Sequence, residues 1–157
     1  MAAPFAEAAV EIAAPIDVVW RVMTDLPRYR EWNPFVVAIE PQGGAFRVGT
    51  AIALTVKWAR QGGARTIEVV DRLDAPARDG EIQRALMEYR FVGWLPRLAL
   101  VRGSRQQALE QRPGGPTTYR TSERFTGLLA RAVPLTKVQD GFERHARALK
   151  ARAESLA

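Results

Sequence analysis

Three side chains of this sequence are candidates for moving a proton near neutral pH: His145, Glu123 and Tyr119. His145 is the only histidine of the chain, and an imidazole changes its charge in this pH range. A carboxylate and a phenol could serve beside it as acid or base. A buried histidine held by a core partner and a glutamate in a cross-strand pair are the structural alternatives. The choice depends on the elements that position these groups.

The segment from Pro134 to Leu156 predicts one long amphipathic helix, which carries His145. Apolar residues recur there every three or four positions, and charged residues occupy the other side. His145 falls near the centre of the apolar arc, and Gly141 lies at its edge. A glycine there gives up about 1 kcal/mol of helix propensity relative to alanine. Gly141 therefore indicates either close approach of another backbone or space left for a ligand.

Alternation of apolar and polar residues predicts that strands form most of the remaining chain. Two short helices are expected after Pro15, at about 16–23 and 27–32. The expected strands cover 6–13, 35–39, 52–58, a segment after Gly63, 81–91, 104–111 and 117–125. Residues 75–80 are predicted to be a loop. Alternation is weaker in 81–91, which indicates a possible β-bulge in that strand.

Two glycine-rich turns predict hairpins with defined registers. Gly62-Gly63 as a two-residue loop would place Trp58 opposite Ile67 and Lys57 opposite Glu68. Apolar side chains would then meet on one face and opposite charges on the other.

The second hairpin crosses Pro113-Gly114-Gly115. Pairing Leu109 with Tyr119 would place Gln107 opposite Thr121 and Arg105 opposite Glu123. These side chains share one face. If that face is concave, a pocket would contain a mutually satisfied Arg–Glu pair together with hydroxyl and amide groups. The alternative is a structural pair near the rim of the sheet.

Consecutive strands joined by tight turns predict an antiparallel sheet, and its apolar face needs cover. The C-terminal helix is the only element large enough to provide it. We therefore expect an α+β fold in which a curved antiparallel sheet of about seven strands wraps around the long C-terminal helix. One domain is expected to span residues 1–157.

This order of elements, together with particular residues, resembles the polyketide cyclase/dehydrase-like, START-related SRPBCC superfamily, which has the helix-grip fold. The resemblance rests on Ile12-Ala13-Ala14-Pro15, Val19-Trp20, Asp25-Leu26, Tyr29, Glu31-Trp32-Asn33-Pro34-Phe35, Val48-Gly49-Thr50, Glu123, Phe125, Gly127 and the helix from Phe142 to Ala153. It implies a cavity between sheet and helix that holds an apolar or aromatic small molecule. Members include carriers, sensors, aromatase/cyclases and quinone- or lipid-handling proteins. They share no catalytic residues that could be carried over.

Composition excludes several kinds of site. The chain has no cysteine and one histidine, so cysteine nucleophiles, zinc–cysteine sites and most histidine metal clusters are ruled out, and neither a metal nor a cofactor is expected. The net charge of +6 comes from twenty arginines spread along the chain, without the basic, aromatic-interleaved run of a single-strand binder. No nucleic-acid partner is expected. No apolar run approaches the ~18 residues of a membrane span, and Met1–Phe5 do not open a signal peptide. A cytoplasmic protein is therefore expected.

The candidate site residues follow from these predicted faces. Ligand binding is predicted for Trp32, Trp58, Tyr89, Arg105, Gln107, Tyr119, Thr121, Glu123, Gly141, Phe142 and His145. The apolar segment 91–101 could form a lid or portal through Phe91, Trp94, Leu95 and Leu98, contact a membrane or partner, or fold as a short helix onto the core.

The leading prediction of function is binding of a hydrophobic small molecule, of aromatic, polyketide-like or lipid-like character, in an internal cavity between the sheet and the C-terminal helix. One alternative is an aromatase/cyclase or dehydratase-type enzyme that uses His145, Glu123 or Tyr119. A second alternative is lipid or quinone handling at a membrane surface, although membrane contact is not the main expectation.

Overall fold

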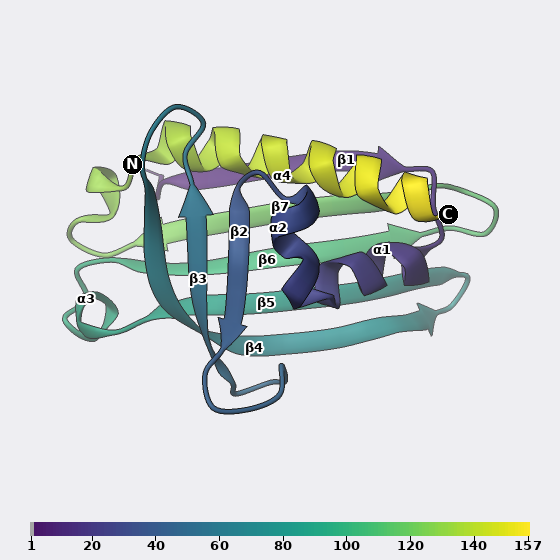
Figure 1. Ribbon diagram of the computed structural model, residues 1–157. Helices are drawn as coiled ribbons and strands as arrows, with labels where there is room; N and C mark the ends of the chain where they lie inside the picture. The colour runs from purple at the N-terminus through teal and green to yellow at the C-terminus, as the bar shows by residue number, and fades with distance from the viewer. Residues whose placement is uncertain (1) are drawn as a thin grey trace.

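The computed structural model describes residues 2–157, which form a seven-stranded antiparallel sheet bent around one long helix (Figure 1). The strands are β1 (Phe5–Ile12), β2 (Val36–Pro41), β3 (Ala51–Lys57), β4 (Gly63–Asp79), β5 (Ile82–Val92), β6 (Arg102–Gln111) and β7 (Thr117–Thr126). The helices are α1 (Ile16–Thr24), α2 (Tyr29–Trp32), α3 (Trp94–Arg97) and α4 (Leu135–Leu156), with 3₁₀ turns η1 (Leu26–Arg28) and η2 (Ala130–Ala132). The strand order is β1-β7-β6-β5-β4-β3-β2. The predicted helix-grip architecture is confirmed.

Helix α4 buries one side against the concave face of the sheet and lies along β1 (Figure 1). Its second half carries Ala146, Leu149 and Ala153, all buried, and packs against α1 as well. Each large apolar side chain removed from water in this way contributes roughly 1.5–3 kcal/mol. The apolar arc of the sequence thus forms the helix–sheet interface, as predicted.

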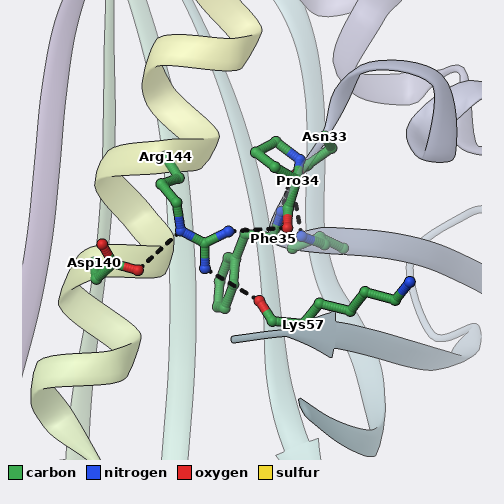
Figure 2. Close-up of polar contacts among 7 residues, drawn as sticks. Asn33, Pro34, Phe35, Lys57, Asp140 and Arg144 are labelled. Carbon is green, nitrogen blue, oxygen red and sulfur yellow. Dashed lines mark hydrogen bonds and ion pairs between the residues drawn. The ribbon is translucent and has the colours of Figure 1, made fainter. Parts of the chain in front are cut away.

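Arg144 fastens α4 to the opposite edge of the sheet, as Figure 2 shows. Its Nε donates to the Asp140 carboxylate at 2.8 Å, one turn earlier in the helix. Its two Nη atoms donate to the backbone carbonyls of Pro34 at 2.9 Å and Lys57 at 3.1 Å. The Pro34–Phe35 segment is fixed in turn because the Asn33 side-chain oxygen accepts from the backbone N–H of Phe35. These contacts hold the start of β2 and the end of β3 against the helix.

The lack of a side chain at Gly141 allows α4 to lie close to Phe35. A Cβ at this position would lie 2.4 Å from the Phe35 ring, far inside van der Waals contact. The glycine makes room for an aromatic side chain of the protein. The two sequence-based explanations, a neighbouring backbone and space for a ligand, are therefore both wrong.

The register predicted for the β3–β4 hairpin is wrong. Lys57 pairs with Gly63 and Val56 with Ala64, so the connection is a longer loop closed by the Trp58 N–H donating to the Gly62 carbonyl at 3.0 Å. Gly63 belongs to the ladder, where a Cβ would stand 2.1 Å from the Val56 carbonyl oxygen.

This correction turns β4 over, because an odd shift of register exchanges the two faces of a strand. Glu68 lies opposite Ile52 and points inward, whereas Ile67 is 42% exposed. The predicted pairing of Glu68 with Lys57 does not occur. The sequence did not reveal the correct register, because residues with good strand propensity occur on both faces of this strand.

Strand β4 also continues through the predicted loop at 75–80 and turns only at Gly80 and Glu81. The ladder between β4 and β5 is interrupted after Val70 and after Asp74, and the second interruption accommodates Pro76. The irregularity expected in 81–91 therefore lies in the partner strand, because each interruption adds one extra residue to β4. The β6–β7 hairpin has the predicted register, with Leu109 opposite Tyr119 and Arg105 opposite Glu123.

The segment 91–101 ends β5 and then forms α3 and a tight turn. Its backbone is joined to the next loop, because the N–H groups of Leu128 and Leu129 donate to the carbonyls of Ala99 and Leu100. In the described part of the chain, no helix is both long and apolar enough to cross a bilayer.

Candidate functional site

The concave face of the sheet does not meet α4 everywhere, and a cavity of about 260 Å³ remains under the first half of the helix. Strands β3 to β7 form its floor and walls, and the approach to α4 together with the helix itself forms its roof. The lining residues are Phe35, Leu54, Val56, Trp58, Ala64, Thr66, Glu68, Tyr89, Phe91, Val101, Gly103, Arg105, Glu123, Phe125, Val133, Pro134, Val138 and Phe142. The wall is therefore largely aromatic and aliphatic, with a small number of charged groups, as is typical of small-molecule sites.

Arg105 is the buried cation of this site. Its Nε donates to the Thr121 hydroxyl at 3.0 Å, and one Nη donates to the Tyr89 phenol oxygen at 3.2 Å. The other Nη lies 3.3 Å from His145 Nδ1. The Phe142 ring covers the guanidinium face, 4.4 Å from Cζ. A buried guanidinium is tolerated where its donors find partners, and here each of its three nitrogen atoms has one.

A layer of polar side chains behind the cavity wall holds this arrangement in place. The Tyr119 hydroxyl donates to the Gln107 side-chain oxygen at 2.8 Å, and the Gln107 amide donates to the Tyr89 oxygen at 3.2 Å. Gln107, Thr121 and Tyr119 are fully buried. Removal from water raises the pKa of Tyr119, which keeps the phenol protonated. The layer is thus a neutral hydrogen-bonded support for Arg105.

His145 belongs to this supporting layer. Its Nδ1 faces two donors, the Asn33 amide at 3.0 Å and Arg105, so Nδ1 carries no proton and the neutral ring is protonated at Nε2. Burial, and secondarily the charge of Arg105, hold the pKa of His145 well below its usual value. The ring stacks on Tyr119, with centroids 5.8 Å apart, and meets Trp32 edge-on at 5.5 Å. His145 does not line the cavity, and its Nε2 has no hydrogen-bond partner among residues 2–157.

Two carboxyl groups face the cavity. Glu68 comes from β4 and Glu123 from β7, and both are lining residues. Burial raises the pKa of Glu68 to about 7, against the opposing effects of its hydrogen bond from Thr66 and the charge of Arg105. Burial and the charge of Glu68 raise the pKa of Glu123 to about 8, again opposed by Arg105. Both carboxyl groups therefore gain or lose a proton near neutral pH, where a general acid or base is most effective.

The structure brings some of the predicted site residues to the cavity and places others elsewhere. The cavity is lined by Trp58, Tyr89, Phe91, Arg105, Glu123 and Phe142. The supporting layer contains Gln107, Tyr119, Thr121 and His145, and Trp32 packs on His145. Gly141 packs on Phe35, and Trp94, Leu95 and Leu98 lie in the α3 segment outside the lining.

Sequence reasoning missed Glu68 and the ring of Phe35. Glu68 was assigned to the outer face by the wrong hairpin register. The signal that could have corrected it was Gly63, whose missing side chain fits a crowded ladder position as well as it fits a turn.

A larger hollow of about 750 Å³ lies on the other face of the sheet, between α3 and strands β5 to β7. Arg90, Arg97, Arg102 and Arg124 contribute to its lining. It is an open surface depression without the convergent buried groups of the inner cavity. The inner cavity is therefore the candidate site despite its smaller volume.

Comparison with solved structures finds the same fold in proteins of low sequence identity. Ginseng major latex-like protein 151 from Panax ginseng has a TM-score of 0.72 and 12% identity, with 95% of this chain and 96% of that chain covered. A START superfamily protein from Mycobacterium smegmatis has a TM-score of 0.68 and 19% identity, with 98% and 99% covered. The Zhui aromatase/cyclase from Streptomyces sp. R1128 has a TM-score of 0.65 and 17% identity, with 96% and 93% covered. These likenesses concern the fold.

Comparison with curated protein sequences gives no match. The family model described as polyketide cyclase / dehydrase and lipid transport, however, matches residues 6–154, which is nearly the whole chain. The sheet, the gripped helix and the cavity between them all lie within the matched range. The protein therefore belongs to the polyketide cyclase / dehydrase and lipid transport family.

Proposed function

We propose that this protein binds a small, ring-containing, mostly apolar molecule in the cavity between the sheet and α4. The cavity under Phe142, with aromatic walls and three ionisable side chains, is the observation that carries the proposal. Its volume of about 260 Å³ lies just below the ~300–1,000 Å³ of most ligand sites, which favours one or two rings over an extended polycycle.

The test is a ligand screen with a variant that fills the cavity. Mass spectrometry of gently purified protein and thermal-shift screening of aromatic, polyketide-like and lipid compounds would identify ligands of the wild type. Val138→Phe would place a larger side chain in the roof of the cavity, and Val48→Phe would change an exposed loop residue in the same way. Ligand-induced shifts should disappear in the first variant and persist in the second. Equal shifts in a folded Val138→Phe protein would refute binding in this cavity.

An enzyme of the aromatase/cyclase or dehydratase kind is a second candidate, and Glu123 favours it. This carboxyl group faces the cavity and titrates near neutral pH, which suits general acid–base catalysis. His145 and Tyr119 stand behind the wall, so each would act as a positioning residue, His145 through Arg105 and Tyr119 through Gln107. Glu123→Gln should then abolish turnover of a bound polyketide-like substrate while preserving its binding. Unchanged turnover would exclude this candidate.

Lipid or quinone handling at a membrane surface is a third candidate. Trp94 and Leu98 are 67% and 63% exposed, and Leu128, on the loop hydrogen-bonded to the α3 segment, is 81% exposed. Exposed tryptophan and leucine beside arginine suit a bilayer interface. Salt-sensitive flotation with anionic liposomes would support this candidate, and loss of flotation in Trp94→Ser would assign it to the α3 segment. Absence of flotation at low salt would exclude a role at the membrane surface.

A further inference from the structure

The polar groups that the cavity leaves free are hydrogen-bond acceptors. Glu68 is only 8% exposed, and one of its oxygens accepts from the Thr66 hydroxyl at 2.8 Å. Among residues 2–157, no donor meets its other oxygen or either oxygen of Glu123. These oxygens face the cavity, so a ligand or solvent there can supply the donor that the protein does not.

Arg105 does not supply that donor. Three of its nitrogen atoms face Thr121, Tyr89 and His145, and its face is covered by Phe142. Although Arg105 lies opposite Glu123 in the ladder, no ion pair within 4 Å joins the two in the described chain. The guanidinium is thus committed to the wall and acts as a fixed positive charge. It is poorly placed to receive the carboxylate of an anionic ligand.

Gly103 on β6 leaves room for the Glu123 carboxyl group. A Cβ at Gly103 would stand 2.6 Å from Glu123 Oε1 and 3.2 Å from the Phe125 ring. The side chain of Glu123 therefore leaves β7 and lies over the neighbouring strand, where the absence of a side chain opens a cradle. This position brings an acceptor into the lining of the cavity that also contains Glu68.

The rest of the wall suits a cation attached to an aromatic ring. Phe35, Trp58 and Phe142 line the cavity on the side of β2, β3 and α4, and Phe125 lines it near Gly103. Aromatic faces attract ammonium groups and stack on aromatic rings, and both effects strengthen where water is excluded.

We propose that the cavity selects a small aromatic amine, whose ammonium group binds between the carboxyl groups of Glu68 and Glu123, and disfavours aromatic carboxylic acids. The inference rests on the proposed binding function and specifies its ligand class. Two carboxylates, Arg105 and one ammonium group would together be electrically neutral. A carboxylic acid would instead add a negative charge beside two acceptors.

Proton release should accompany this binding. The charged and titratable groups facing the pair are Arg105 from β6 and Tyr89 from β5, while the α4 residues of the lining, Val138 and Phe142, carry no charge. His145 lies behind Arg105 and stays neutral. An ammonium group favours the ionised carboxylates, so it should displace protons that the free site holds at pH 6. Affinity for the amine should therefore rise with pH, by at most tenfold per unit for each proton released.

The experiment compares three probes of similar shape on the full chain: 2-phenylethylamine, 2-phenylethanol and 3-phenylpropionate. Isothermal titration at pH 6 and pH 8, in buffers of different ionisation enthalpy, measures both affinity and proton release. We expect the amine to bind at least tenfold more tightly than the acid at pH 8, to release protons, and to weaken several-fold at pH 6. Glu123→Gln and Glu68→Gln should each lose about tenfold for the amine and keep 2-phenylethanol, while the exposed-turn variant Glu81→Gln should match the wild type.

The outcomes separate this inference from the proposed function. Tighter binding of 3-phenylpropionate, or a pH-independent affinity for the amine, would overturn the ligand class. Binding of 2-phenylethanol without binding of the amine would overturn it and leave the proposed function standing. Failure of all three probes and of the wider ligand screen would overturn both. If the Gln variants do not fold, the wild-type pH series and Gly103→Ala, which displaces the Glu123 carboxyl group without removing it, still decide the matter.

Discussion

Glu68 should make this protein less stable as the pH rises, and replacement by glutamine should remove much of that dependence. Burial raises the pKa of Glu68 from 4.5 to about 7. Between these values the native protein holds the proton and the unfolded chain does not. Because the native state then binds more protons, the free energy of unfolding falls as the pH rises through this range. Glu68→Gln keeps an uncharged group of the same size and cannot ionise.

The expected size of the effect follows from the width of that range. One pKa unit corresponds to 1.36 kcal/mol, so Glu68 should lower the free energy of unfolding by roughly 3 kcal/mol between pH 4.5 and 7. Glu123 extends the same trend to about pH 8, although its ionisation is coupled to that of Glu68. His145 acts in the opposite direction. Its lowered pKa costs stability as the pH falls below about 6.5, and this contribution cancels when wild type and variant are compared.

Urea unfolding followed by tryptophan fluorescence at pH 5, 6, 7 and 8 measures the difference directly. The wild type should lose roughly 2.5 kcal/mol relative to Glu68→Gln across this series, since the series begins above the lower end of the range. The double variant with Glu123→Gln should depend least on pH. Glu81→Gln, in the exposed turn between β4 and β5, should follow the wild type. Parallel stability curves for the wild type and Glu68→Gln would refute the inward position and burial of Glu68.

Three further predictions concern the groups around the cavity. Gly141→Ala should destabilise the fold by about 1–2 kcal/mol in thermal or urea unfolding, because crowding against Phe35 outweighs the ~1 kcal/mol gain in helix propensity. Phe35→Leu in the same chain should remove most of that cost. If the two substitutions instead have additive effects on the free energy of unfolding, the contact is contradicted. Arg105→Met should cost more stability at pH 9 than at pH 5, because both carboxyl groups must then ionise without a nearby cation; an equal loss at the two pH values would argue against this electrostatic role. His145 should remain the neutral Nε2–H tautomer well below pH 6.5, because burial lowers its pKa. In a chain with one histidine, ¹⁵N NMR reads this tautomer without ambiguity, and titration near pH 6.5 would contradict the burial.

Elements with strong local signals were predictable from the sequence. The heptad-like apolar spacing of 134–156 defined α4, and Gly114 with strict alternation on both sides fixed the β6–β7 register, which placed Arg105 opposite Glu123. The β3–β4 register was not predictable in this way. Gly62 and Gly63 fit a tight turn, and only the sheet shows that Gly63 is needed in the ladder beside Val56.

The sequence by itself determined which residues share a face, because side chains alternate along a strand and recur every three to four residues along a helix. Only the tertiary structure decided what each face meets. It placed Arg144 on the Pro34 and Lys57 carbonyls and brought the Phe35 ring onto Gly141. It also left a cavity under Phe142 where, among residues 2–157, only Thr66 donates to the two carboxyl groups of Glu68 and Glu123. Desolvation and the proximity of charges set the ionisation of these groups, and both depend on elements that are far apart in the chain and adjacent only after folding.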